Sequence, residues 1–364
     1  MFGAAIGVPG GRERVMRLIF VHWVYEDRGS AQDLYNYREA AQQLGHEVVV
    51  YGPPELSSFR YSLEIGAADA IIFIVEWTTA LQRGDQLDWL RLAARVPRAR
   101  RVVIDCDGKY NDAISVVGDH NHPDAGSSRA WIEICDSLSD KIYQPTRHPL
   151  RSNVGTFFFH AYNPAWAMPL DFSEKSFGMI YVGNNWFRWG QLQRILRVVE
   201  QVRPEVGRIG ITGQGWDKSP AWANSSISED AYHSDPDYLK RLGVEVTAAV
   251  RFDQVIASMG GGVFTPVLYR PLFEHLRLVT CRTFETPAAN TIPVFGLDPE
   301  FVDETYGGRA RALALPEDRP EELIRDVVRH PYHYAAIVEE MRRELAERHS
   351  YAVRLQELVR IVEE

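Results

Sequence analysis

The sequence predicts an α/β protein with two facing domains, each a doubly wound parallel sheet covered by helices. Short apolar runs suited to buried strands alternate with stretches of helical periodicity in both halves of the chain. The 364 residues suit two domains of roughly 150–180 residues each. We expect a flexible leader over 1–16, an N-terminal domain over 17–165, a C-terminal domain over 166–348 and a final helix over 349–364.

The first half of the chain contains the first series of strands and helices. Apolar runs predict strands at 18–22, 46–51, 70–75 and 101–104. The centres of these runs are apolar, which is typical of parallel strands that are buried on both faces. Helical spacing of apolar residues predicts helices over 31–44 and 82–94, and Gly45 stands where a glycine commonly ends a helix.

A second series follows a segment at 152–176 that has no helical period, contains prolines, and is the predicted linker between domains. Strands are predicted at 177–182, 208–212, 244–250 and 291–295, and helices at 186–202, 320–330, 335–348 and 351–362. The segment 215–236 is rich in Ser, Asn, Asp and Pro, and we expect it to be a surface loop that closes over a ligand.

Composition narrows the class of protein. Hydrophobic residues make up 45% of the chain and charged residues 24%, as in globular proteins with a substantial core. The net charge of −9 argues against a nucleic-acid partner, because such partners usually need a basic surface. The 35 arginines against 5 lysines favour local phosphate pockets, and they suggest a bacterial source of high GC content.

Targeting and cysteine patterns predict a cytoplasmic protein. No apolar run approaches the roughly 18 residues that span a membrane, and the N-terminus lacks the apolar core of a signal peptide. The cysteines Cys106, Cys135 and Cys281 are far apart and match neither a disulfide framework nor a zinc pattern. We therefore expect reduced cysteines and no membrane span.

The segment 281–295 carries the most chemistry. It is predicted to form a helix start followed closely by a buried strand, and a helix N-terminus offers free N–H groups to a diphosphate. Glu285, about one turn into the helix, can accept hydrogen bonds from a ribose diol, and Arg282 can neutralise the diphosphate. The alternative is an ordinary helix start in which Glu285 complements the helix dipole.

The run Arg282-Thr283-Phe284-Glu285 resembles the R-x-F-E-x-x-A-x-G signature of CgeB-like, group 1-type glycosyltransferases. The resemblance implies the GT-B fold, in which an N-terminal acceptor domain faces a C-terminal nucleotide-sugar domain and the last helix crosses back to the first domain. It also implies that Glu285 contacts the nucleotide ribose. This chain departs from the family by having Asn290 in place of the glycine and Arg277 in place of a second glutamate.

Further segments match the family pattern in the expected order. The segment 181–188 resembles the opening of the second domain, 211–216 its G-x-G turn, and 29–48 the start of the acceptor domain. A strand that ends in glycine is also commonplace, so each match alone is weak. The predicted donor-binding residues are Gly183, Asn184, Arg188, Gly213, Gln214, Arg282, Thr283 and Glu285, and the predicted acceptor-binding residues are Gly29 and Ser30.

The run Asp105-Cys106-Asp107-Gly108-Lys109 follows a buried strand and has several interpretations. It can be a metal-binding Asp-x-Asp, or the nucleophile segment of a haloacid-dehalogenase-type phosphatase with Asp105 attacking phosphorus. It can also place Asp105 and Asp107 beside the acceptor, where one of them orients or deprotonates a hydroxyl. The structural alternative is a pair of strand-end carboxylates satisfied by loop N–H groups.

Histidines offer two further candidates. His22 ends the first predicted strand, where it is either a catalytic base or a histidine satisfied within the fold. The run 119–124 contains two Asp, two His and one Asn, but its spacing matches no common zinc pattern. We therefore predict no metal site.

Together these observations predict a metal-independent glycosyltransferase for hexosyl or related groups. It would move a sugar from a nucleotide-diphosphate sugar, its co-substrate, to a hydroxyl or amine of a small molecule, glycan or natural product, without a cofactor and without nucleic acid as a partner. The catalytic candidates are His22, Asp105 and Asp107. The alternatives are a non-catalytic nucleotide-sugar-binding protein, a sugar-nucleotide epimerase of the same fold, and a phosphatase that uses Asp105.

Overall fold

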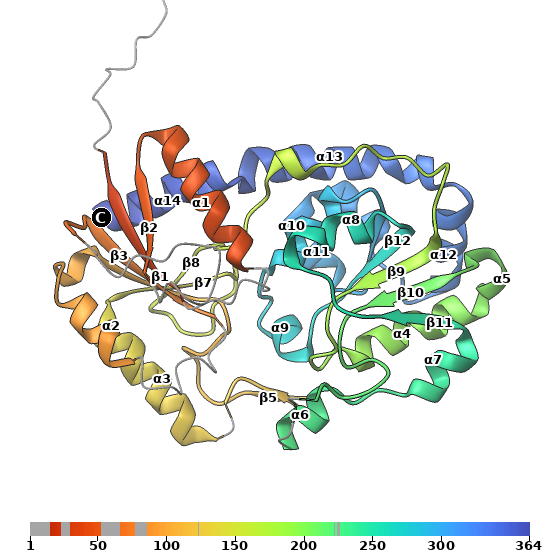
Figure 1. Ribbon diagram of the computed structural model, residues 1–364, viewed down its shortest axis with the longest axis horizontal. Coiled ribbons are helices and arrows are strands. Elements are labelled where there is room, and N and C mark those ends of the chain that lie inside the picture. Colours follow the sequence, from red (N-terminus) through yellow and green to blue (C-terminus); the bar gives the residue numbers. More distant parts are fainter. Residues whose placement is uncertain are drawn as a thin grey trace, which may run out of the picture.

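The computed structural model describes residues 15–22, 30–51, 66–76, 86–122, 124–221, 223 and 226–364. Within these ranges, two parallel sheets form the centres of two α/β domains (Figure 1). The predicted fold class of two doubly wound domains is confirmed. Most of the predicted leader, residues 1–14, lies outside the described residues.

The N-terminal sheet is parallel and has the strand order β2-β1-β3-β4-β7-β8. Alternate residues of β1 pack on opposite faces, with Leu18 and Phe20 under α1 and α14, and Ile19 and Val21 on the side of α2 and α3. Its elements are β1 (Arg17–Val21), α1 (Ser30–Leu44), β2 (Glu47–Tyr51), β3 (Ala70–Val75), α2 (Gln86–Ala93), β4 (Arg101–Asp105), the hairpin β5 (Ser115–Val116) and β6 (Asp119–His120), α3 (Ala125–Leu138), β7 (Lys141–Gln144) and β8 (Val154–Thr156).

The C-terminal sheet has the order β11-β10-β9-β12-β13 and is also parallel. From β9 the chain first adds β10 and β11 on one side, and it then crosses back to add β12 and β13 on the other side of β9. Ligands bind beside such a switch point in doubly wound folds. Its elements are β9 (Phe177–Val182), α4 (Trp189–Gln201), α5 (Arg203–Val206), β10 (Ile209–Thr212), α6 (Ser226–Ala231), α7 (Pro236–Leu242), β11 (Val244–Thr247), α8 (Val255–Met259), β12 (Gly262–Val267), α9 (Pro271–His275), α10 (Cys281–Ala288), β13 (Ile292–Phe295), α11 (Pro299–Tyr306) and α12 (Pro320–Arg329).

Two consecutive helices, α13 (Pro331–His349) and α14 (Tyr351–Glu363), run from the C-terminal domain to the N-terminal domain along the top of Figure 1. Ser350 separates them, and its side chain caps α14 by accepting a hydrogen bond from Val353 N. Leu355 and Leu358 of α14 are buried in the same cluster as Leu34 of α1. The end of the chain therefore completes the core of the first domain.

Three strands of the two large sheets, and the short hairpin of β5 and β6, escape the sequence-based prediction. β7 is half polar, β8 contains Gly155, and β12 begins with glycine and contains Pro266. β12 pairs with β9 only through Gly262 and Phe264, so Pro266 costs that pairing no hydrogen bond. In these strands the tertiary contacts override a weak local pattern.

The predicted linker begins too early in the sequence. β8 belongs to the N-terminal sheet, and Phe157, Phe159 and Ala161 beyond it are buried in the N-terminal core. The chain therefore leaves the first domain only after Ala161. The predicted loop at 215–236 contains the short helix α6, and residues 222, 224 and 225 within it lie outside the described residues.

Candidate active site between the domains

Loops at the carboxyl ends of both sheets meet where the two domains touch. Val279 N donates to Pro145 O at 2.7 Å, and Leu272 N donates to Asp119 Oδ2 at 2.9 Å. The carboxyl ends of parallel strands are where ligand-binding side chains gather in such folds. We call the ionisable side chains at this junction the interdomain site: Glu76, Asp107, Lys109, Arg188, Arg270, Arg282 and Glu285.

Asp105, at the end of β4, is held entirely by the protein. Its buried carboxylate accepts hydrogen bonds from the backbone N–H groups of Asp107 at 3.2 Å, Lys109 at 2.9 Å and Tyr110 at 2.7 Å, and from Gln144 Nε2 at 2.8 Å. A carboxylate bound by four fixed donors shapes its loop and is poorly placed to attack a substrate. The geometry favours the structural interpretation of Asp105 over a catalytic or phosphatase role.

Asp107 has the opposite surroundings, although it lies only two residues away. Its side chain is partly exposed, and within the described ranges its carboxylate accepts no hydrogen bond. Burial raises the pKa of Asp107 above its ordinary value, against the opposing charges of Arg270 and Lys109. A carboxylate with a free oxygen and a raised pKa is suited to accept a proton from a substrate hydroxyl.

His22 directly follows β1 and holds the carboxylate of Glu76, a residue that the sequence did not single out. Its fully buried ring donates from Nε2 to Glu76 Oε2 at 3.0 Å and stacks on Phe159. Glu76 directly follows β3 and is the more exposed partner, with 13% of its side chain accessible. Glu76 therefore faces the junction, and the geometry supports His22 as a residue that positions it. The sequence feature that could have identified Glu76 is its position directly after the apolar run 70–75.

A second buried group lies beside this pair. His160 Nδ1 donates to Asp33 Oδ2 at 3.0 Å, and Tyr351 Oη donates to Asp33 Oδ1 at 2.6 Å. Burial works to lower the pKa of His160, but the charge and hydrogen bond of Asp33, helped by Glu76 and Glu285, raise it to about 9. The His160 side chain is therefore a fixed cation between carboxylates of both domains.

The predicted acceptor-binding pair is only partly described. Ser30, the first residue of α1, is buried and forms a hydrogen bond with Glu76. That hydrogen bond, together with the one from His22, lowers the pKa of Glu76 against the effect of burial, which is the largest influence and raises it. Gly29 lies outside the described residues.

The two glycine turns of the C-terminal domain are packed against each other. A Cβ at Gly213 would collide with the Gly183 carbonyl, so this approach requires glycine. Gln214 N donates to Asn184 Oδ1 at 2.9 Å, and Trp216 Nε1 donates to Gly183 O at 2.8 Å. The structure thus brings the predicted residues together, but their groups bond one another and form a rigid base beside the switch point.

Arginines line the switch point on both sides. Arg188 follows the Gly183 turn at the start of α4, and its Nη1 donates to Asn184 O at 3.0 Å. Arg270 follows β12, and its positive charge lies within electrostatic range of Arg188. Sequence reasoning missed Arg270 because the strand before it was not recognised.

The start of α10 holds the remaining predicted donor residues. Thr280 and Thr283 form a reciprocal capping box, and the Thr283 hydroxyl also bonds the Tyr269 hydroxyl. The Thr283 hydroxyl is thus engaged within the fold, and its contact with the donor stays a prediction. Arg282 Nη1 donates to Glu285 Oε2 at 2.5 Å, with 20% of the Arg282 side chain exposed.

A small cavity of about 10 Å³, comparable to the space of a single water molecule, lies next to Glu285. Its walls come from α1, the segment after β8, α10 and the start of α14. The lining residues are Gln32, Asp33, Ala161, Trp166, Cys281, Glu285 and Tyr351. The buried Glu285 side chain therefore borders a small void between elements of the two domains.

The run 119–124 serves the domain contact. Asp119 is fully buried and accepts from Leu272 N of the other domain, and His120 packs edge-on against Phe187. His122 Nε2 donates to Lys109 O at 3.0 Å, and burial lowers the pKa of His122 to about 4. Over the described part of the chain, no three His, Cys, Asp or Glu side chains converge as metal ligands would.

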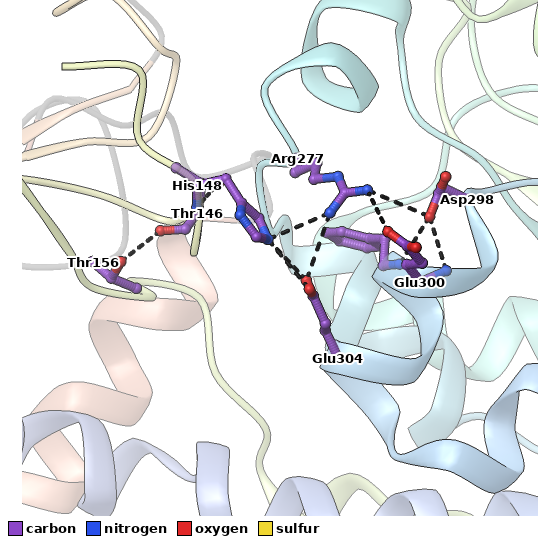
Figure 2. A network of polar contacts seen from close by, with 8 residues as sticks. Thr146, His148, Thr156, Arg277, Asp298, Glu300 and Glu304 are labelled. Carbon is purple, nitrogen blue, oxygen red and sulfur yellow. Dashed lines mark hydrogen bonds and ion pairs between the residues drawn. The ribbon is translucent and has the colours of Figure 1, made fainter.

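Arg277 lies in a separate network on the same domain boundary (Figure 2). Its guanidinium pairs with Glu300 at 3.4 Å and approaches Glu304 at 3.9 Å, while His148 of the N-terminal domain contacts Glu304 at 3.1 Å. The residue that replaces the family's second glutamate thus takes part in a domain contact. Its backbone is left-handed, with φ of 50°, which is uncommon for a residue with a side chain.

The chain matches no family model and no curated protein. Solved structures do match over nearly its whole length. An alpha-glucosyltransferase in complex with UDP and a 13-mer DNA containing a central A:G mismatch has a TM-score of 0.65 at 15% identity, over 96% of this chain and 100% of that chain. The T4 phage BGT in complex with its UDP-glucose substrate has a TM-score of 0.53 at 14% identity, over 96% and 97%.

A third match is an alpha-glucosyltransferase in complex with UDP and a 13-mer DNA containing a HMU base, with a TM-score of 0.64, 16% identity, and coverage of 96% of this chain and 100% of that chain. These likenesses show that the chain has the GT-B fold. At identities this low, the likeness shows the fold alone and does not show the activity.

The same comparisons correct the predicted set of partners. The net charge of −9 predicted that nucleic acid is not a partner, yet two of the similar structures hold DNA on this fold. The exclusion was wrong because net charge averages over a surface, whereas binding depends on local fields. None of the helices in the described ranges has both the length and the hydropathy needed to cross a membrane.

Proposed function

We propose that this chain is a glycosyltransferase that moves a sugar from a UDP-sugar to a hydroxyl group of its acceptor. The observation that carries the proposal is that, on a GT-B fold, the carboxylate of Asp107, which accepts no hydrogen bond from the described residues, lies within electrostatic range of Arg270 of the facing domain. The C-terminal domain also supplies the Arg282–Glu285 pair at a capped helix start. UDP-glucose is the proposed donor, because the T4 phage neighbour has it as its substrate.

The donor half of the site is argued from α10 and the switch point. Glu285 is buried beside a cavity and held by Arg282, an arrangement that suits hydrogen bonds from a ribose diol. Arg188 and Arg282 supply fixed positive charge to the diphosphate, as guanidinium groups commonly do. Gly183 and Gly213 pack closely against each other in the turns beside Arg188.

The acceptor half is argued from the strand ends of the N-terminal domain. In the proposed reaction, Asp107 takes the proton of the acceptor hydroxyl, the hydroxyl oxygen bonds to the anomeric carbon, and the bond from that carbon to the β-phosphate breaks. The electron pair of the broken bond leaves with the phosphate oxygen, so the products are the glycoside, UDP and a proton. Glu76, held by His22, supplies a second carboxylate for other hydroxyl groups.

We further propose a nucleic-acid acceptor. The support is the pair of neighbours that hold UDP and DNA together, one of them with a HMU base. Three further statements stay predictions: that the chain belongs to the CgeB-like family, that it acts without a metal ion, and that it is cytoplasmic. The alternatives of a non-catalytic binding protein and of an epimerase also stay open. The buried, fully bonded carboxylate of Asp105 gives the phosphatase alternative no support.

The first experiment measures thermal shifts with UDP, GDP, dTDP and ADP, each with and without EDTA, on the wild type and Glu285→Ala. A ligand at about 100 times its dissociation constant adds roughly 2.7 kcal/mol of stability, enough to move the melting temperature by a few degrees. We expect UDP to stabilise the wild type despite EDTA and to have little effect on the variant. Absence of any nucleotide shift in the wild type would refute the proposed donor.

The second experiment measures transfer of labelled glucose from UDP-glucose to duplex DNA with or without HMU bases, and to water. Label in the DNA supports the proposed acceptor, and loss of that label in Asp107→Asn supports the proposed base. Free glucose without any product in DNA would favour the epimerase alternative. Donor binding with no transfer to any acceptor would favour a non-catalytic binding protein.

A further inference from the structure

Arg270 is a buried cation without hydrogen bonds. Only 9% of the residue is exposed, and within the described ranges its guanidinium donates no hydrogen bond. Asp119 Oδ1 lies 3.6 Å from Nη1, beyond hydrogen-bond distance, and the Phe273 ring lies 4.0 Å from Cζ. The Nε–H group is fully buried, and none of the described residues offers it an acceptor.

Such an arrangement is costly for the protein alone. A guanidinium has five N–H donors, and a buried donor without an acceptor loses its hydration with nothing to replace it. By contrast Arg342, buried to a similar extent, donates to the carbonyl groups of Pro287, Ala288 and Ala289. The described residues thus provide hydrogen-bond acceptors for the guanidinium of Arg342 but not for that of Arg270. The N–H groups of Arg270 therefore remain available to an acceptor on a ligand.

The neighbours of Arg270 indicate the charge of that acceptor. Arg188 repels it across the switch point, and Lys109 of the N-terminal domain lies close enough to be affected by its charge. Three cations therefore gather here within electrostatic range of the carboxylates of Asp107 and Asp119, and Lys109 is also within range of Asp105. The Asp105 carboxylate is already bound by four hydrogen bonds inside its own loop. Like charges held together at a partly desolvated site attract an anion.

We propose that Arg270 binds the β-phosphate of the donor diphosphate, between Arg188 on the donor side and Asp107 on the acceptor side. This inference rests on the proposed function and adds to it a ligand for the phosphate that leaves. The leaving phosphate lies one bond from the anomeric carbon, so it belongs between the diphosphate site and the base. Arg270 feels the charges of both Arg188 and Asp107, as a group at that position must.

Asp119 restrains the orientation of the Arg270 side chain. Its carboxylate is fixed by Leu272 N at 2.9 Å and His120 N at 2.9 Å, and it holds the Arg270 side chain from the facing domain without a hydrogen bond. The guanidinium is thus oriented before the donor arrives, while its donors stay available. Orientation in advance lowers the entropy cost of binding.

The test compares the affinities of UDP, UMP and uridine by isothermal titration calorimetry, for the wild type, Arg270→Gln, Arg270→Lys and Arg277→Gln. Arg277→Gln removes the same charge from the same segment but outside the interdomain site. We expect Arg270→Gln to weaken UDP binding about 10- to 100-fold and UMP binding less than threefold, since only UDP carries the β-phosphate. Arg270→Lys should recover part of the loss, and Arg277→Gln should leave the UDP to UMP ratio unchanged.

Several outcomes would overturn the inference, and they are separable from failure of the proposed function. If wild type binds UDP more tightly than UMP and Arg270→Gln keeps that ratio, the inference fails while the proposed donor stands. If Arg270→Gln weakens only binding to a 13-mer DNA duplex, the phosphate comes from the acceptor and the inference fails. If the wild type binds no nucleotide and its affinity for pyrophosphate does not depend on Arg270, both proposals fail. Melting temperatures of the unliganded variants confirm that each is folded.

Discussion

At the scale of single residues, two carboxylates in one loop have opposite surroundings. Asp105 accepts four hydrogen bonds in the interior, whereas Asp107 is partly exposed and accepts none from the described residues. The chemistry of an aspartate depends on this difference, because a saturated carboxylate has no oxygen to offer a substrate. We expect the two residues to fail in different ways when they are changed.

Asp107→Asn should lower kcat about 100-fold or more, because an amide cannot take the acceptor proton, and it should leave UDP affinity within about twofold. Asp105→Asn should lower the free energy of unfolding by about 2–3 kcal/mol, because its new NH₂ group would face the loop donors. Transfer assays and urea denaturation measure the two effects. Equal loss of stability in both variants would contradict the assignment.

His160 should make stability depend on alkaline pH. Its folded pKa of about 9 lies above the ordinary value of 6.5, so the paired cation stabilises the fold fully below pH 6.5 and loses its effect as pH rises through 9. The difference of about 2.5 units corresponds to on the order of 3 kcal/mol. Melting temperatures of the wild type and His160→Gln should therefore converge between pH 6 and 10. A constant gap across that range would argue against a charged His160.

At the scale of elements, α10 combines a structural cap with the proposed donor contacts. Thr280 and Thr283 satisfy N–H groups at its start, while Arg282 projects from the first turn and Glu285 from the next. The predicted donor motif therefore contains residues with different roles. The i, i+3 spacing of the ion pair keeps Arg282 and Glu285 on one face of the helix.

Thr283→Val should separate these roles. Loss of the cap and of the bond to Tyr269 should lower the free energy of unfolding by about 1–2 kcal/mol, while UDP affinity stays within twofold at a temperature where the variant is folded. Thr286→Val on the same helix is the matched control, since its hydroxyl makes only a 3.6 Å contact with Met259 Sδ. Thermal denaturation and calorimetry measure both quantities. A large loss of UDP affinity in Thr283→Val alone would show that the Thr283 hydroxyl contacts the donor.

At the scale of the whole molecule, the C-terminal helix α14 packs into the core of the N-terminal domain. α14 packs on α1, and Tyr351 at its start bonds Asp33 of α1, which in turn holds His160. On the other side of the boundary, Arg277, Glu304 and His148 join the domains through exposed ion pairs (Figure 2). Exposed pairs contribute little free energy, so the apolar packing of α14 dominates this coupling.

Leu355→Ala should therefore destabilise the N-terminal domain from the far end of the sequence. A buried leucine replaced by alanine costs about 2–5 kcal/mol through lost burial and the cavity left behind. Hydrogen exchange should show faster exchange in β1 and α1, whereas Gln356→Ala, on the exposed side of α14, should change little. Faster exchange confined to α13 would contradict this packing.

The sequence alone determined the fold class and most of the elements. Apolar runs such as Ala70–Val75 predict buried parallel strands because hydrophobic burial is a property of the run itself. Helix starts and glycine turns are likewise local, which is why the segment around Arg282 and Glu285 and the turns at Gly183 and Gly213 were found. Local chemistry therefore located the C-terminal half of the candidate site.

Only the tertiary structure decided which side chains meet and which remain available. Asp105 and Asp107 are equivalent as sequence, and the loop that saturates one and leaves the other open exists only in the folded chain. Glu76 and Arg270 carry no local signature, since each is defined by partners from distant segments. Long-range contacts set burial and electrostatics, and these quantities turn a carboxylate or a guanidinium into a working group.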